Sequence, residues 1–170
     1  MSYHWIFDLS THHILFFLIS FVSGSVPYGL LIARAMGKGD VRSQGSGNIG
    51  ATNVARVAGK KGAALTFIAD FLKGFIPTLA ALSFFDPTVG FYATFGAILG
   101  HVYSPFLRFK GGKGLATMCG CFLALFPGIA GLGVLGWIVT FYLPRISSLS
   151  ALVSLVVLAM SGFVWGTPQE

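Results

Sequence analysis

Residues 62–85 read GAALTFIADFLKGFIPTLAALSFF, an apolar run long enough to cross the hydrocarbon core of a bilayer, which takes about 20 residues of helix. Its only charged residues, Asp70 and Lys73, lie three positions apart, a spacing that brings them to one face of a helix. We interpret them as an intramembrane ion pair that is either purely structural or braces a site nearby. The stretch therefore predicts a membrane-spanning helix.

Five other apolar segments are interpreted in the same way. They lie at residues 14–36, 89–107, 115–126, 128–143 and 149–165. The segment 115–126 is too short to cross a bilayer upright, so we expect a half-helix or a tilted helix that joins the next segment around Pro127. We predict an all-α, polytopic integral membrane protein with about six hydrophobic segments, at least one of them short or broken, forming one membrane-embedded domain over residues 1–170.

The composition excludes an ordinary soluble protein. Of 170 residues, 55% are hydrophobic and only 9% are charged, and the mean hydropathy is +0.81. A globular domain carries roughly 25% charged residues, which cover its water-facing surface. The formal net charge of +6 comes from residues beside the apolar segments. We therefore expect anionic lipids or phosphorylated substrates as partners, and no nucleic acid.

The basic residues predict the orientation in the membrane. Ten of the eleven lie in loops on one side of the predicted spans, whereas Asp8, Asp86 and Glu170 lie on the other. Because Lys and Arg mark the cytoplasmic side, we expect these loops in the cytoplasm, and both the N-terminus and the end of the sixth segment outside. The ten residues are Arg34, Lys38, Arg42, Arg56, Lys60, Lys61, Arg108, Lys110, Lys113 and Arg145.

The first basic loop contains the glycine-rich stretch GSGNIGATNVAR at residues 45–56. Its glycines, Ser, Thr and two Asn can bring backbone N–H groups and small side-chain donors close to an anion, and Arg56 can bind phosphate with two parallel hydrogen bonds. We interpret the loop as a phosphate cradle. Its G-x-G-x-x-G pattern also occurs in dinucleotide-binding folds, but those need a preceding strand, which the apolar neighbours do not suggest. A plain flexible connector is the other alternative.

A second glycine-rich loop reads GHVYSPFLRFKGGKG at residues 100–114. Its last glycines free the backbone around Lys113, and a helix expected from Leu115 would present its N-terminus, which favours anions. The P-loop pattern is not met because Gly114 follows Lys113, and no acidic partner for Mg²⁺ is evident. We therefore predict a second phosphate cradle rather than a nucleotide hydrolase.

Few residues near the two loops can act as acids or bases. His101 is the only histidine close to them and is a candidate general base, although a lone histidine at a helix end is more often structural. Asp40 is the only carboxylate nearby. Cys119 and Cys121 lie in an apolar run and are interpreted as core residues, not as a disulfide or metal ligands. No metal and no cofactor are expected.

Four stretches together resemble one enzyme family. They are GSVPYG at residues 24–29, SGNIGATNV at 46–54, DFLKG at 70–74, and the loop from Gly100 through FKGGKG at 109–114. In this order they closely resemble the bacterial acyl-phosphate-dependent glycerol-3-phosphate acyltransferases, the PlsY family. The resemblance covers the chain up to about Ser154.

The resemblance implies an enzyme of the bacterial inner membrane. Such an enzyme moves a fatty acyl group from a long-chain acyl-phosphate to the sn-1 hydroxyl of glycerol-3-phosphate, giving lysophosphatidic acid and phosphate. Its partners would be these two substrates and membrane lipids. A substrate phosphate is implied as the base, which agrees with the scarcity of acids and bases here. The H-x-x-x-x-D pair of other glycerolipid acyltransferases is absent, because Phe106 follows His101 at the position of the acid.

Taken by position, the resemblance and the loops assign catalytic roles to Ser46, His101 and Lys113. Substrate binding is assigned to Gly47, Asn48, Thr52, Asn53, Arg56, Lys110, Gly111, Gly112, Gly114 and Ser148. Ser148 begins a stretch that matches a third family motif only in part, since Ala151 stands near the place of its second serine. Family members usually continue into a final helix that contributes to the site. We expect either a fragment or a member that closes its site differently.

One alternative of another class stays open. Broken helices and intramembrane charges also suit a small transporter or channel for an anionic metabolite. No inverted repeat is evident in the sequence, which favours the acyltransferase.

Overall fold

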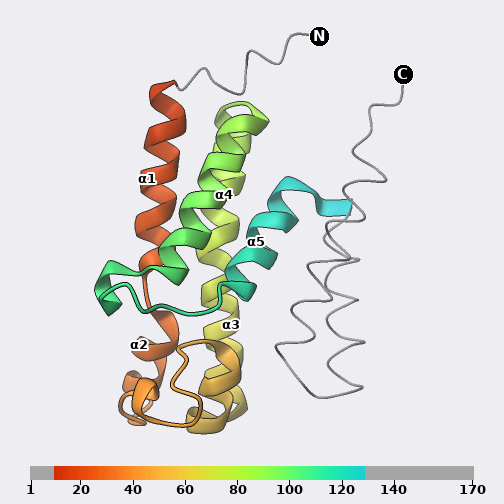
Figure 1. The fold of residues 1–170 in the computed structure, drawn as a ribbon. Coiled ribbons are helices and arrows are strands. Elements are labelled where there is room, and N and C mark those ends of the chain that lie inside the picture. Colours follow the sequence, from red (N-terminus) through yellow and green to blue (C-terminus); the bar gives the residue numbers. More distant parts are fainter. Residues whose placement is uncertain (1–9, 129–170) are drawn as a thin grey trace. The chain divides into compact units, whose positions relative to one another are not determined.

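A computed structural model describes residues 10–128, and these residues form helices and loops without any strand (Figure 1). The helices are α1 (Thr11–Ser25), α2 (Tyr28–Ala35), α3 (Ala51–Phe84), α4 (Pro87–Val102) and α5 (Leu115–Leu125), with two 3₁₀ turns, η2 (Val41–Ser43) and η3 (Pro105–Leu107). The chain forms two compact units, Met1–Leu125 and Phe126–Glu170. Of the predicted segments, 149–165 and all of 128–143 after Gly128 lie outside the described residues.

The first predicted segment, 14–36, is two helices and not one. α1 ends at Ser25 and α2 begins at Tyr28, with Pro27 between them. Proline has no N–H to donate to the preceding turn, so the helix breaks there. The freed carbonyls are satisfied inside the protein: Ser104 Oγ donates to the carbonyl oxygen of Ser25 (2.6 Å), and Lys73 Nζ donates to that of Val26 (2.8 Å). The break is tolerated within the apolar part of the chain because the side chains of Lys73 and Ser104 donate hydrogen bonds to it.

α3 is longer than the predicted segment 62–85 because it starts in the first loop. Gly59 has left-handed backbone angles, φ 74° and ψ −177°, which divide α3 into a short helix at 51–58 and a long one at 60–84. Glycine reaches this region without a steric penalty. The short part carries the end of the glycine-rich stretch, and the long part carries Asp70 and Lys73 into the bundle.

α1 packs against α4, and α3 packs against α5, through small residues. Gly24, Gly96 and Gly100 lie so close to the facing backbone that a Cβ at any of them would collide with it. Gly74 and Gly120 play the same part between α3 and α5. Close backbone approach through small residues is the usual way in which helices associate in membranes. α5 begins at Leu115 as predicted, and it ends at Leu125.

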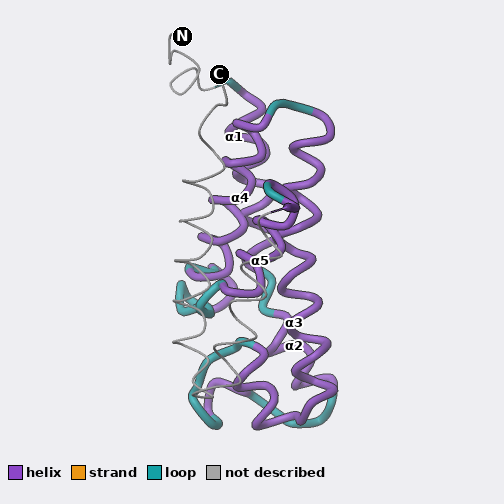
Figure 2. The backbone as a smooth tube through the Cα atoms, turned by 90° about the vertical axis from the view of Figure 1, so that its right-hand side faces the viewer, coloured by secondary structure: helices purple, strands orange, loops and turns teal. Residues whose placement is uncertain are grey.

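The distribution of side chains is that of a membrane protein. By length and composition, Thr11–Ala35 and Ala51–Phe84 can each cross a membrane. Large apolar side chains point outward along them, among them Leu18, Val22, Ile68 and Ile76, whereas Asp70, Lys73, Thr78, Thr94 and His101 are buried. Figure 2 shows the long helices running roughly side by side, with the first polar loop at the end where α2 meets α3. This outward apolar face agrees with a lipid environment.

Candidate functional site

The first loop is built around one buried asparagine at the start of α3. The Asn53 side chain is 1% exposed, and its Nδ2 lies 2.9–3.0 Å from the carbonyl oxygens of Val41, Gln44 and Asn48. Its Oδ1 accepts a hydrogen bond from the backbone N–H of Ser46 (2.8 Å). The polar atoms of Asn53 are thus occupied by the loop backbone, which indicates a positioning role. Its predicted contact with substrate stays a prediction.

Several backbone N–H groups of the first loop are also used internally. Gly47 donates its N–H to the carbonyl oxygen of Gln44 (3.0 Å), and Gly50 donates to Asn48 Oδ1 (2.8 Å). Gly45 has φ 58°, and a Cβ there would collide with Asn53 Oδ1, so glycine is needed for this turn. The sequence predicted a cradle of backbone N–H groups and small side-chain donors, and this stays a prediction. The N–H groups of Ser46, Gly47 and Gly50 are used within the loop itself.

Three polar side chains of this loop face outward. Ser46, Thr52 and Arg56 are exposed, and Arg56 Cδ lies 3.8 Å from the place where a Gly45 Cβ would stand. The Arg56 side chain therefore passes near Gly45, the residue before Ser46. A guanidinium and a hydroxyl on one loop are groups that can bind phosphate.

A charge cluster at Asp40 fixes the approach to the first loop. Arg42 Nη2 lies 2.6 Å and Arg34 Nη2 3.1 Å from Asp40 Oδ2, and the backbone N–H of Arg42 donates to Asp40 Oδ1 (2.9 Å). The hydrogen bonds from Arg42 hold the pKa of the Asp40 carboxyl well below its usual range. Asp40 therefore acts as a loop brace. It stays ionised near neutral pH, and its oxygens are held by Arg34 and Arg42.

The second loop folds back onto the end of α4. Gly111 donates its backbone N–H to the carbonyl oxygen of Val102 (2.9 Å), and Gly112 donates to that of His101 (3.1 Å). The predicted phosphate contacts of these two glycines stay a prediction, but their N–H groups already have partners. Lys110 and Lys113 are exposed, and Gly114 precedes α5 with φ 74°. The loop is shaped by its glycines and presents lysine side chains.

His101 lies beneath this loop, 3% exposed. Its Nδ1 is 3.2 Å from Thr117 Oγ1 of α5 and 3.8 Å from Asp70 Oδ1 of α3. The ring of His101 occupies the place where a Gly112 Cβ would stand. Sequence reasoning missed Thr117, because only the packing of α4 against α5 brings it to the histidine.

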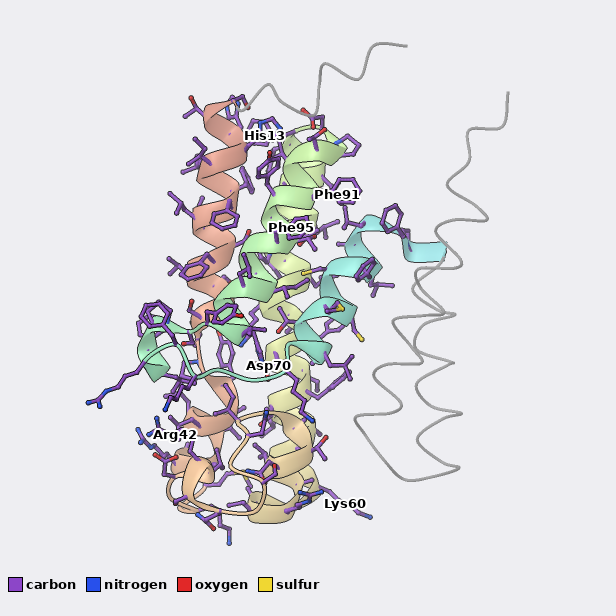
Figure 3. All side chains as sticks on the ribbon, viewed as in Figure 1. His13, Arg42, Lys60, Asp70, Phe91 and Phe95 are labelled. Carbon is purple, nitrogen blue, oxygen red and sulfur yellow. The ribbon has the colours of Figure 1, made fainter. Side chains whose placement is uncertain are left out.

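Asp70 and Lys73 form the predicted ion pair, with 2.8 Å between Lys73 Nζ and Asp70 Oδ1 and 2% of each side chain exposed. Lys73 also lies 5.7 Å from the ring centroid of Tyr28. Because Lys73 donates to the Val26 carbonyl as well, the pair ties α3 to the break between α1 and α2. Figure 3 shows Asp70 within the bundle, with Arg42 and Lys60 at the loop end and His13 at the opposite end.

The two loops share one hydrophobic cluster. Leu107 of η3 packs into the same buried group as Val41, Ile49 and Val54, which also contains Leu30, Ala33 and Ala58. Ile49 in turn lies directly against Gly29 of α2. The two predicted phosphate loops therefore pack on the same hydrophobic cluster. Ser148 lies outside the described residues.

Comparison with known proteins identifies close relatives. The chain matches the family model of glycerol-3-phosphate acyltransferase over residues 14–168. The glycerol-3-phosphate acyltransferase of Erythrobacter litoralis (strain HTCC2594) is 44% identical over 151 residues, which cover 89% of this chain and 76% of that protein. The glycerol-3-phosphate acyltransferase of Bartonella henselae is 47% identical over 147 residues, which cover 84% of this chain and 70% of that protein.

Two solved structures have the same fold. PlsY (YgiH), an integral membrane glycerol 3-phosphate acyltransferase, in its glycerol 3-phosphate form gives a TM-score of 0.87 at 39% identity, covering 92% of this chain and 79% of that one. The lysophosphatidic acid form gives a TM-score of 0.84 at 39% identity, covering 92% and 78%. These likenesses confirm the predicted fold class and the resemblance on which the site assignment rests.

Proposed function

Because the chain belongs to the glycerol-3-phosphate acyltransferase family, we propose that it transfers a fatty acyl group from acyl-phosphate to the sn-1 hydroxyl of glycerol-3-phosphate. The products are lysophosphatidic acid and phosphate. One observation carries the proposal beyond family membership: two polar loops, presenting Arg56 with Ser46 and Lys113 respectively, rest on one hydrophobic cluster beside an apolar helix bundle. Both substrates carry phosphate, and one carries a lipid tail.

The proposed reaction needs charge stabilisation more than a strong base. The glycerol hydroxyl attacks the carbonyl carbon of acyl-phosphate, the new ester C–O bond forms, and the bond from that carbon to the phosphate oxygen breaks. The hydroxyl proton goes to a substrate phosphate. Arg56 and Lys113 bind the phosphate groups and neutralise charge that develops on the leaving phosphate. Ser46, which is exposed on the first loop, hydrogen-bonds a reacting oxygen.

The remaining predicted residues are assigned by their place in the loops. Thr52 and Lys110 are exposed and suited to direct contact with a phosphate group. Gly47, Asn48, Asn53, Gly111, Gly112 and Gly114 shape the loops that carry these contacts. The general-base role of His101 stays a prediction, and its burial favours a positioning role.

We place the protein in the bacterial cytoplasmic membrane with its N-terminus outside and both loops in the cytoplasm, as one membrane-embedded domain over residues 1–170. The basic loop residues support this orientation. Labelling tests it: a cysteine at Gln44, which is exposed, should react with a membrane-impermeant maleimide only after the cells are opened. Labelling in intact cells would mean that the loops face the outside, which is the opposite orientation.

The activity is tested with purified protein in lipid. Palmitoyl-phosphate and labelled glycerol-3-phosphate should give labelled lysophosphatidate, whereas palmitoyl-coenzyme A in place of palmitoyl-phosphate should give none. Product from the coenzyme A ester would refute the proposed donor. Uptake of an anionic metabolite into vesicles without any acyl transfer would favour the alternative, a small transporter or channel.

A further inference from the structure

We propose that His101 is a positioning residue whose ring is the template on which the second loop takes its phosphate-binding shape. The inference rests on the proposed function, because it assigns a role within the same site. It starts from where the ring lies. His101 is 3% exposed at the end of α4, below the loop and not at its surface.

The second loop crosses the ring at Gly112 and passes near it again at Gly114. A Cβ at Gly112 would collide with His101 Nε2, and the nearest neighbours of that position are all ring atoms of His101. A Cβ at Gly114 would lie 3.9 Å from His101 Cδ2. The His101 carbonyl oxygen also accepts the N–H of Gly112 (3.1 Å). The backbone and the side chain of His101 therefore fix how closely the loop approaches the end of α4 on either side of Lys113.

Neighbouring helices fix the ring in turn. Thr117 Oγ1 lies 3.2 Å from Nδ1, and Thr117 itself is fully buried in α5. Asp70 Oδ1, already paired with Lys73, lies 3.8 Å from the same nitrogen. A general base must reach the substrate hydroxyl directly or through one water. Here Nδ1 is held by Thr117 and Nε2 lies under Gly112, so the ring acts on the substrate through the loop.

Steric rescue separates this role from catalysis. Gly112 lies outside the left-handed region, so an alanine there is opposed by the His101 ring and not by its own backbone angles. Gly112→Ala should raise the KM for one of the two phosphate substrates about tenfold, on the scale of one or two lost hydrogen bonds. Asparagine at position 101 keeps a polar group near the Nδ1 position but lacks the ring atoms under Gly112. The pair His101→Asn/Gly112→Ala should therefore recover most of that loss.

Gly111 provides the matched control. A Cβ at Gly111 would collide with the carbonyl oxygens of His101 and Val102, which a change of the His101 side chain does not move. His101→Asn should thus fail to rescue Gly111→Ala. If His101→Asn rescued both glycine variants, it would act by loosening the loop in general. If the KM increases of His101→Asn and Gly112→Ala multiplied in the pair, the two residues would act independently. Either result would overturn the proposal, as would a folded His101→Asn protein with no transfer.

A second variant avoids the loop altogether. Thr117→Val keeps the size of the side chain and removes the hydroxyl near Nδ1, so the same KM should rise about fivefold with kcat within about twofold. The control is Thr94→Val, because Thr94 is a buried threonine of α4 whose hydroxyl lies 3.4 Å from Thr78 and away from His101. Equal KM changes in the two threonine variants would contradict the template role.

Thermal unfolding distinguishes failure of this inference from failure of the proposed function. If the wild-type protein showed no acyl transfer, the proposed function would fail. The Gly112→Ala protein should still unfold at a lower temperature than wild type, and His101→Asn should still restore that temperature in the pair. If the pair restores neither the KM nor the unfolding temperature, the template role of His101 is ruled out.

Discussion

At the scale of single residues, the charged groups divide into those that can reach a substrate and those that hold the scaffold. Arg56 and Lys113 are exposed on the two loops, whereas Lys73 is buried and paired. Asp40 is occupied by Arg34 and Arg42. The same residue types therefore do different work according to burial and to the partners that the fold gives them.

Arg56→Ala and Lys113→Ala should each abolish most acyl transfer while the protein stays folded in the membrane. Loss of one charge-assisted phosphate contact costs about 2–4 kcal/mol of transition-state binding, or about 30- to 1,000-fold in rate. Steady-state kinetics measures it. Lys60→Ala is the control, since Lys60 is an exposed basic residue of α3 outside both loops and should keep wild-type rates. Full activity of either loop variant would contradict the proposed roles.

Asp40→Asn should loosen the approach to the first loop. The folded pKa of Asp40 lies below its ordinary value of 3.8, because Arg42 and Arg34 stabilise the ionised form. Its contribution to stability is therefore complete above about pH 4 and is lost only as pH falls through the lower folded value. At mildly alkaline pH, trypsin should cut after Arg42 faster in Asp40→Asn than in wild type. Asp86→Asn, which makes the same change of charge at the N-cap of α4, should leave this cut unchanged.

At the scale of the helices, close packing through glycine places the loops. Gly24, Gly96 and Gly100 let α1 and α4 approach backbone to backbone, and Gly74 and Gly120 do so for α3 and α5. Figure 1 shows the second loop running from the end of α4 to the start of α5. Its position thus depends on how closely these two helix pairs pack.

Gly100→Ala should destabilise the bundle. Its Cβ would collide with the carbonyl oxygen of Phe21 in α1, and overpacking of this kind costs about 1–3 kcal/mol. The unfolding temperature in detergent measures the effect. Ala64→Val adds bulk at an exposed position of α3 and serves as the control that should unfold like wild type. An unchanged unfolding temperature for Gly100→Ala would mean that α1 and α4 are free to move apart.

At the scale of the whole described unit, the Asp70–Lys73 pair of α3 lies close to α4 and to the break between α1 and α2. Lys73 satisfies both Asp70 and the carbonyl of Val26, and Asp70 reaches toward His101. Removal of one member leaves the other buried and unpaired, a loss of about 3–5 kcal/mol. Replacing Asp70 and Lys73 together by apolar residues leaves no unpaired buried charge.

Asp70→Ala and Lys73→Met should each lower the yield of folded protein, and the double variant should be better expressed than either. It should stay below wild type, because the Val26 carbonyl loses the hydrogen bond from Lys73 and keeps only that from the Tyr28 N–H. Fluorescence-detected size-exclusion of detergent extracts compares the four proteins. Equal yields for the three variants would show that the two residues do not act as a pair.

The sequence by itself determined the membrane class, the helical fold, the ion pair and the two glycine-rich loops. These follow from local rules: apolar length sets a membrane span, a three-residue spacing puts Asp70 and Lys73 on one face, and glycines mark the loops. The break between α1 and α2 was missed, although Pro27 marks it, because the apolar run continues through it and hydropathy does not register a missing N–H.

Only the tertiary structure decided which polar groups the folded loops use for their own hydrogen bonds. Asn53 and the N–H groups of Gly111 and Gly112 look like phosphate donors in the sequence, yet the folded loops use them for their own hydrogen bonds. Contact of Thr117 with His101 spans two helices, and no spacing along the chain encodes it. The physical reason is that a buried donor must be satisfied by whatever the fold brings near it, and that partner is known only once the helices are packed.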